Sequence, residues 1–187
     1  MKRALYVGLL VVCGLVAWFG SRWEVADGKI DVELVCAGDR CEASFDGYRS
    51  LEAKITSSRF AERVGLYIYH PWERDAHTRF RDFVFERHSS GLDAYQLSLT
   101  ELDHAGWFDD LGDSRWVLTE GKGLEHRGEQ DSRSVAMFAP PTERDFRLQL
   151  TLEDAVDAGI LFRANSEETG WLLIVRHGYN DAFFAHM

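Results

Sequence analysis

Hydrophobic and polar residues alternate with a period of two along much of the chain after residue 28. In the first such stretch, Ile30, Val32 and Leu34 alternate with Asp31 and Glu33. This alternation is typical of strands with one buried face and one wet face. Further short runs are rich in aromatic and β-branched residues and are bounded by turn residues. They predict strands at 51–55, 64–69, 80–85, 116–118, 135–138, 145–152, 159–163, 170–176 and 182–185.

About ten short strands separated by Gly, Asp and Pro turns predict an all-β antiparallel sandwich or barrel. Nothing in the order of elements indicates alternating strands and helices. One exception is the stretch 98–111, where Leu99, Leu102, Trp107 and Leu111 roughly follow helical spacing. We therefore expect one short helix there, after a linker that begins with the residues HSSGL at 88–92.

The start of the chain has a different pattern. Residues 4–20 (ALYVGLLVVCGLVAWFG) carry no charge and follow Lys2 and Arg3. As a helix they would reach about 26 Å, close to the thickness of a bilayer's hydrocarbon core. Tyr6 and Trp18 lie near the two ends, where amphipathic rings prefer the headgroup level. We expect residues 1–22 to form a cytoplasmic tip and a transmembrane anchor, with residues 23–187 outside the cytoplasm.

The alternative for this segment is a cleaved signal peptide. A leader-peptidase site needs small residues at fixed positions, and Trp18 and Phe19 do not provide them. A lipoprotein signal would use Cys13, which lies in the middle of the apolar run. A retained single-pass anchor is therefore favoured. It predicts a protein of the bacterial inner membrane, with its N-terminus in the cytoplasm and its domain in the periplasm.

Composition and net charge limit the class of protein and the kinds of partner that can be expected. The chain has 187 residues, of which 45% are hydrophobic and 28% charged, which excludes a disordered chain or a multi-span membrane protein. Lys and Arg number 21 against 31 Asp and Glu, giving a net charge of −10. Such a surface repels phosphate, so nucleic acid is not an expected partner.

Two cysteines indicate a disulfide. Cys36 and Cys41 bracket a four-residue turn between alternating stretches, and facing hairpin positions suit a disulfide in an oxidising compartment. Half of a zinc site is the alternative, but the sequence has no second cysteine pair.

Several motifs together carry a resemblance to a known family. In the second half these are WVL at 116–118, DFRL at 145–148, DAGILFR at 157–163 and GWLL at 170–173. In the first half they are FDG at 45–47, RVGLY at 63–67 and FRDF at 80–83. Together they resemble concanavalin A-like jelly rolls, especially the 3-keto-disaccharide hydrolase-like and LamG-like domains.

In those domains the two groups of motifs come in the opposite order. The resemblance therefore implies a circularly permuted jelly-roll β-sandwich. Residues 29–87 would correspond to the family's C-terminal strands and residues 105–187 to its N-terminal strands, with 88–104 as the bridging linker. Permutation is plausible because the termini of compact domains often lie close together. The alternative is two half-domains, each completed by another chain.

No catalytic constellation stands out, and we predict no catalytic residue, cofactor or metal. The glycosidase pattern of two carboxylates has no clear match. Asp31 and Glu33, like Asp154 and Asp157, are interpreted as acidic residues that face solvent. Two weaker possibilities remain for metal ions: a site at His70, His77 and Asp75, and a calcium site at Asp109, Asp110 and Asp113.

Binding is the favoured kind of function. Trp72 follows Pro71 in an expected loop, and with His70 and Trp107 it forms the candidate interaction surface, whereas Trp171 is expected in the core. The first hypothesis is a non-catalytic accessory or structural subunit of a larger membrane complex, for example a photosynthetic or respiratory one. Gly8 and Gly14 would allow the anchor to approach other helices.

The second hypothesis is a membrane-anchored carbohydrate-binding module or degenerate sugar hydrolase. An exposed aromatic platform on the sheet would favour this carbohydrate hypothesis. A flat apolar patch would favour the accessory subunit.

Overall fold

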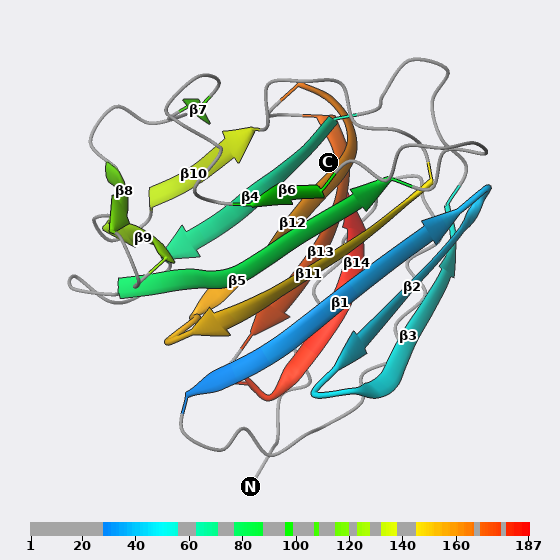
Figure 1. The fold of residues 1–187 in the computed structure, drawn as a ribbon, viewed down its shortest axis with the longest axis horizontal. Coiled ribbons are helices and arrows are strands. Elements are labelled where there is room, and N and C mark those ends of the chain that lie inside the picture. The colour runs from blue at the N-terminus through cyan, green and yellow to red at the C-terminus, as the bar shows by residue number, and fades with distance from the viewer. Residues whose placement is uncertain are drawn as a thin grey trace, which may run out of the picture.

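The chain folds into two antiparallel β-sheets that pack face to face (Figure 1). The structure is a computed structural model. It describes residues 28–55, 63–70, 77–87, 96–98, 107–108, 115–119, 123–127, 132–137, 145–166, 169–176 and 179–187. We name the two layers sheet A and sheet B.

Sheet A has eight strands and contains the beginning of the described chain. Its order is β3-β2-β1-β11-β5-β9-β8, and β6 also pairs with β5. The strands are β1 (Lys29–Ala37), β2 (Arg40–Phe45), β3 (Tyr48–Lys54), β5 (His77–Arg87), β6 (Gln96–Ser98), β8 (Arg115–Thr119), β9 (Gly123–Arg127) and β11 (Phe146–Glu153).

Sheet B has six strands and contains the end of the chain. Its order is β14-β13-β12-β4-β10-β7. The strands are β4 (Arg63–His70), β7 (Trp107–Phe108), β10 (Ser132–Met137), β12 (Asp157–Ser166), β13 (Thr169–Arg176) and β14 (Asp181–His186).

Strands from the two halves of the chain alternate in both sheets. In sheet A, β11 lies between β1 and β5. In sheet B, β4 lies between β12 and β10. The two halves therefore complete each other within one chain, and the alternative of half-domains completed by another chain is not supported.

The core lies between the sheets, as the alternating pattern requires. Along β1 the even-numbered residues are buried, and along β11 Phe146, Leu148, Leu150 and Leu152 are buried in the same way. The ring of Phe162 in sheet B meets Phe146 in sheet A edge to face at 6.4 Å between centroids. Burial of these large rings is the main source of stability.

The prediction of an all-β fold built from two antiparallel sheets is confirmed, and every stretch predicted as a strand contains one. The helix expected within 98–111 is wrong at Trp107–Phe108, which forms the short strand β7 on the edge of β10. Strand pairing overrides the local helical spacing there. Within the expected linker 88–104, residues 96–98 form β6 and pair with β5.

The expected membrane anchor lies outside the described residues, as do its residues Tyr6, Gly8, Gly14 and Trp18. Among the residues that the structure describes, no helix is long and apolar enough to cross a bilayer.

Candidate functional site

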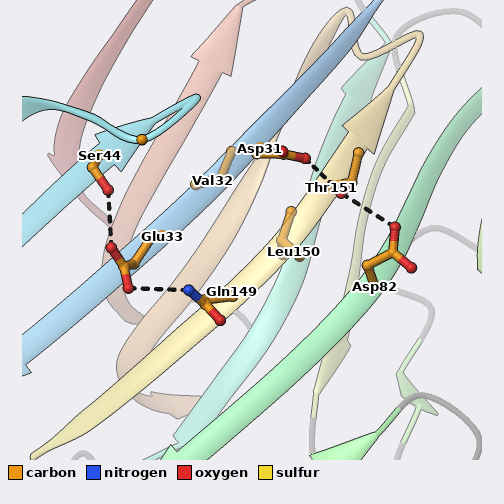
Figure 2. Close-up of a pocket in the computed structure, with 9 residues that line it drawn as sticks. Asp31, Val32, Glu33, Ser44, Asp82, Gln149, Leu150 and Thr151 are labelled. Carbon is orange, nitrogen blue, oxygen red and sulfur yellow. Dashed lines mark hydrogen bonds between the residues drawn. The ribbon is translucent and has the colours of Figure 1, made fainter.

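A polar hollow of about 460 Å³ lies on the outer face of sheet A. Figure 2 shows its side chains on neighbouring strands of that sheet. It is formed by β1, β2, β5 and β11 and by the turn after β2. Its lining residues are Asp31, Val32, Glu33, Ser44, Gly47, Asp82, Gln149, Leu150 and Thr151. We call it the sheet A pocket.

Strand register brings the polar lining together. Asp31 lies opposite Thr151, and Glu33 lies opposite Gln149, across the β1–β11 ladder. Directly opposite residues of an antiparallel pair point to the same face, so these four side chains all point outward. All four residues have odd numbers and belong to the solvent-facing half of the alternating pattern, whose other half forms the core.

Glu33 is the centre of one hydrogen-bond network. Its carboxylate accepts hydrogen bonds from Arg147, from the Gln149 amide at 3.1 Å and from the Ser44 hydroxyl at 3.1 Å. The Arg147 guanidinium also lies 3.6 Å from Glu86. The hydrogen bond to Glu33 raises the pKa of Arg147. Glu33 is therefore held in place and its charge is balanced.

Thr151 connects two further carboxylates. Its hydroxyl lies 2.7 Å from Oδ1 of Asp31 and 3.4 Å from Oδ2 of Asp82 (Figure 2). Asp82 faces this side from a left-handed backbone position, with φ of 50°, where the β11–β5 register shifts. A hydroxyl has one proton, so it donates to one carboxylate at a time. Among the residues that the structure describes, no ion pair neutralises Asp31 or Asp82.

Farther along the same face, charges are paired. Glu153 contacts Arg81 at 2.8 Å and Lys29 at 2.9 Å, and Arg79 lies 3.7 Å away. Burial alone would raise the pKa of Glu153, but the hydrogen bonds from Lys29 and Arg81 outweigh that effect and lower it. The pocket is thus the part of this face where acceptors outnumber cations.

The pocket can bind a polar ligand through both donors and acceptors. The second N–H of the Gln149 amide offers a donor, while Asp31 and Asp82 offer acceptors on rigid strands. One exposed aromatic lies near its rim: Tyr48, which follows Gly47 and is 78% exposed. The described lining contains no aromatic platform.

The outer face of sheet B is apolar, in contrast to sheet A. Its centre is a second buried cluster on β4, β10, β12 and β13, separate from the core between the sheets. The buried members are Tyr67, Val135, Met137, Leu161, Ala164 and Leu172, and the half-buried hydrophobics around them are Tyr69, Ile174, Ala185 and Met187. We call these four the sheet B rim.

One corner of that face is polar. Arg176 on β13 forms a two-pronged ion pair with Asp181 on β14, and the rings of Tyr179 and Phe183 lie within 4.9 Å of its guanidinium carbon. The hydrogen bond with Asp181 raises the pKa of Arg176. Asp157 is half-buried beside this pair, and burial raises its pKa to about 6. Its interpretation as a solvent-facing acid is therefore wrong, because it begins a strand next to apolar residues.

The structure confirms the expected disulfide and locates only part of the predicted interaction surface. Cys36 and Cys41 face each other across the β1–β2 hairpin and are joined, with Cα atoms 4.2 Å apart. His70 ends β4 and Trp107 begins β7, so their backbones lie in sheet B, but their side chains lie outside the description. Trp72 lies outside the described residues altogether.

The weaker expectations about metal ions find no support in the described part of the chain. No group of His, Cys, Asp or Glu side chains there could hold a metal ion. His77 instead lies 3.2 Å from Glu125. Asp75 and the residues Asp109, Asp110 and Asp113 fall outside the description. Trp171 packs on the core, as expected.

Sequence reasoning missed four pocket residues: Ser44, Asp82, Gln149 and Thr151. For Asp31 and Glu33 the sequence predicts only that they face solvent as a pair. The alternation along 145–152 placed Gln149 and Thr151 on a polar face, which was the available signal. Nothing local indicated which strand that face would meet.

Comparisons with known protein families and with curated proteins find no match for this sequence. The chain is therefore described by its own fold and surfaces: a two-sheet antiparallel β-sandwich with one polar and one apolar outer face.

Proposed function

We propose that the protein is a non-catalytic, single-pass membrane protein whose β-sandwich serves as an accessory subunit of a larger membrane complex. The domain would stand on the periplasmic side, behind the anchor expected at 1–22. The observation that carries the proposal is the half-buried apolar sheet B rim. The permuted concanavalin A-like topology is part of the same proposal, supported by the sequence motifs and by the two-sheet architecture.

The physical argument rests on the difference between the two outer faces. A sheet whose outer face meets water alternates apolar and polar residues, and sheet A does so. On the outer face of sheet B the central apolar residues are already buried within this chain, at 0–8% exposure. Only the sheet B rim is half-buried, and it is this rim that leaves apolar surface for a partner. The anchor would hold that surface close to a neighbouring subunit in the same membrane.

Extraction from native membranes in mild detergent tests this proposal. The chain should migrate with other subunits in a complex of fixed stoichiometry. Ile174→Lys, on the sheet B rim, should release it. Val35→Lys is the matched control, because Val35 is also a half-buried β-branched residue, but faces outward from sheet A. Migration of the wild-type chain without other subunits would contradict the proposal.

A second candidate function is supported by the sheet A pocket. Its mixed donors and acceptors on a rigid surface suit a neutral, polyhydroxylated ligand, as in a membrane-anchored carbohydrate-binding module or degenerate sugar hydrolase. Against it, the described lining offers no ring on which a sugar could stack.

Calorimetry of the full chain in detergent with neutral oligosaccharides tests this second function. Gln149→Ala and Thr151→Val should each abolish the binding heat. Thr169→Val, at an exposed position on β13 in sheet B, should leave it unchanged. Absence of binding to any oligosaccharide by the wild-type chain would remove this candidate and leave the accessory-subunit proposal untouched.

A further inference from the structure

The sheet A pocket has two ends that differ in charge. At the first end the carboxylate of Glu33 is paired with the guanidinium of Arg147 and also accepts hydrogen bonds from neutral side chains. At the second end Asp31 and Asp82 both lie beside the Thr151 hydroxyl (Figure 2). A ligand that fills this cavity of about 460 Å³ therefore meets a paired carboxylate at one end and two carboxylates without an ion pair at the other.

The positive side chains next to the second end are engaged with other carboxylates. Lys29 and Arg81 both contact Glu153, at 2.9 and 2.8 Å. Arg79 lies 3.7 Å from the same carboxylate and 3.9 Å from Asp154. In the described part of this face the network holds equal numbers of cations and carboxylates, namely Lys29, Arg79 and Arg81 with Glu125, Glu153 and Asp154. It therefore has no excess of positive charge to offer the pocket.

Asp46 adds a third carboxylate beside the second end. Its Oδ1 accepts a hydrogen bond of 3.0 Å from the N–H of Asp31, and its own N–H donates to the carbonyl of Asp31 at 2.8 Å. Gly47, the next residue, lines the pocket. Among the residues that the structure describes, no ion pair neutralises any of the three carboxylates. Their mutual repulsion is relieved when a positive group binds between them.

The acceptors at the second end match the donors of a primary ammonium group. The Thr151 hydroxyl lies 2.7 Å from Asp31 and 3.4 Å from Asp82. Because the hydroxyl donates its single proton to one carboxylate, its lone pairs remain able to accept. A primary ammonium has three N–H donors and no acceptor. One such group can therefore donate to both carboxylates and to the hydroxyl.

Other cations match this end less well. Ca²⁺ takes about six to eight oxygen ligands, and no group of three metal-binding side chains is found in the described part of the chain. A guanidinium is best matched by the two oxygens of a single carboxylate. Here the acceptors come from three separate side chains on three strands, which suits a compact charge.

We propose that the sheet A pocket binds a sugar that carries a free amino group. The ammonium lies at Asp31 and Asp82, and the ring hydroxyls lie at the first end, where Gln149 offers its second N–H. This inference rests on the second candidate function, which places a polyhydroxylated ligand in the same pocket, and it names the class of sugar. A cavity of about 460 Å³ is within the usual range for small-molecule sites, about 300–1,000 Å³.

Calorimetry of the full chain in mild detergent with a matched pair of ligands tests the inference. A trisaccharide of glucosamine and the N-acetylated form of the same trisaccharide share rings and linkages, but acetylation removes the charge. At about pH 6 the free amines are protonated, since such amines have pKa values near those of α-amino groups. The amino sugar should bind about tenfold more tightly or better, and added salt should reduce this preference.

Asp82→Asn tests the role of the second end. It removes one negative charge and keeps the size of the side chain, so the ratio of the two affinities should fall about tenfold, toward one. Asp154→Asn is the matched control. Asp154 is also an exposed aspartate with a left-handed backbone, with φ of 54° against 50° at Asp82, but it does not line the pocket. Circular dichroism checks that both variants keep their sheets.

Ethanolamine separates the ammonium group from the sugar ring. It carries an ammonium and one hydroxyl but cannot reach the first end of the pocket. It should bind about tenfold more weakly than the glucosamine trisaccharide, or worse. Equal affinities for the two would overturn the assignment to a sugar.

The remaining outcomes distinguish this inference from the function on which it rests. Equal affinities for the free and the N-acetylated trisaccharide would overturn the inference and leave the second candidate function standing. Absence of binding by both trisaccharides and by neutral oligosaccharides would overturn the two together. Displacement of the amino sugar by one equivalent of Ca²⁺ would overturn the inference in favour of a metal site.

Discussion

Arg163, on β12 in sheet B, donates a hydrogen bond of 2.6 Å to the carbonyl of Ile55, just after β3 in sheet A. A second hydrogen bond joins its guanidinium to the carbonyl of Gly38 in the β1–β2 turn. Arg163 is only 2% exposed and its backbone is left-handed, with φ of 48°. One side chain thus connects the two sheets and the two halves of the chain.

Replacing Arg163 with Met should therefore destabilise the protein strongly. The Ile55 carbonyl would lose its donor in a buried place, the Gly38 carbonyl would lose its donor in a partly exposed turn, and the cavity left by the side chain adds to a total cost of about 2–4 kcal/mol. Urea unfolding of the full chain in micelles, followed by tryptophan fluorescence, measures this. Arg40→Met is the control: Arg40 also pairs with a carboxylate, but at the surface, so its loss should cost less than about 1 kcal/mol. Equal costs for the two variants would contradict the role given to Arg163.

The disulfide makes a separate prediction. Cys36 and Cys41 are both fully buried and close a short loop. A short closed loop is expected to contribute about 2 kcal/mol through the unfolded state. The double variant Cys36→Ala, Cys41→Ala should lose about this free energy of unfolding. Dithiothreitol should lower the urea midpoint of the wild-type chain and leave that of the double variant unchanged. A midpoint that falls equally in both would show that the reductant acts elsewhere.

The sequence predicted the layers of this fold better than its surfaces. Alternation along β1 and along β11 identified which residues are buried, because a period of two is a local property. Asp31 and Thr151, however, are 120 residues apart and meet only through the β1–β11 ladder. Their contact depends on which strands pair. The packing of the whole core determines which strands pair, and no local pattern in the sequence indicates it.

Two other features could not be predicted from the sequence, for related reasons. Asp82 reaches the pocket because of a left-handed backbone and a shifted register, where simple alternation fails. Strand β9 was not predicted because Gly123–Arg127 contains few apolar residues, and pairing with β5 and β8 makes it a strand. By contrast, the Cys36–Cys41 disulfide was predictable, since a hairpin turn fixes it locally.

Gly159 provides a third prediction, from close backbone approach. A Cβ atom at this position would lie 1.8 Å from the carbonyl oxygen of Leu173, on the neighbouring strand β13. Backbone atoms in the middle of a sheet cannot move away cheaply. Gly159→Ala should cost more than about 3 kcal/mol in urea unfolding or prevent folding.

Gly38→Ala is the matched control for Gly159→Ala. A Cβ atom at Gly38 would meet nothing within 4 Å, although its φ of 57° imposes some backbone strain. That strain should cost only about 1–2 kcal/mol. A Gly159→Ala protein as stable as the Gly38→Ala protein would show that β12 and β13 are farther apart than described.

Asp157 predicts how stability depends on pH. Burial raises the pKa of its carboxyl to about 6, and the nearby carboxylate of Asp181 adds to the rise, while Arg176 opposes it. In the unfolded chain an Asp has a pKa near 3.9. The folded state therefore holds this proton more tightly, and the contribution of Asp157 falls as pH rises from about 4 to about 6.

Asp157→Asn should remove that dependence. Because the carboxyl is only half-buried, solvent screening reduces the effect to about 1–2 kcal/mol. The variant should be more stable than the wild-type chain at pH 7 and about equally stable at pH 4. Asp154→Asn is the control, since Asp154 is an exposed aspartate in the turn before β12 and Asn tolerates its left-handed backbone. Urea unfolding at several pH values measures the free energy of unfolding of each variant. An Asp157→Asn protein that is less stable than wild type at pH 7 would contradict the prediction and mean that ionised Asp157 stabilises the fold through Arg176.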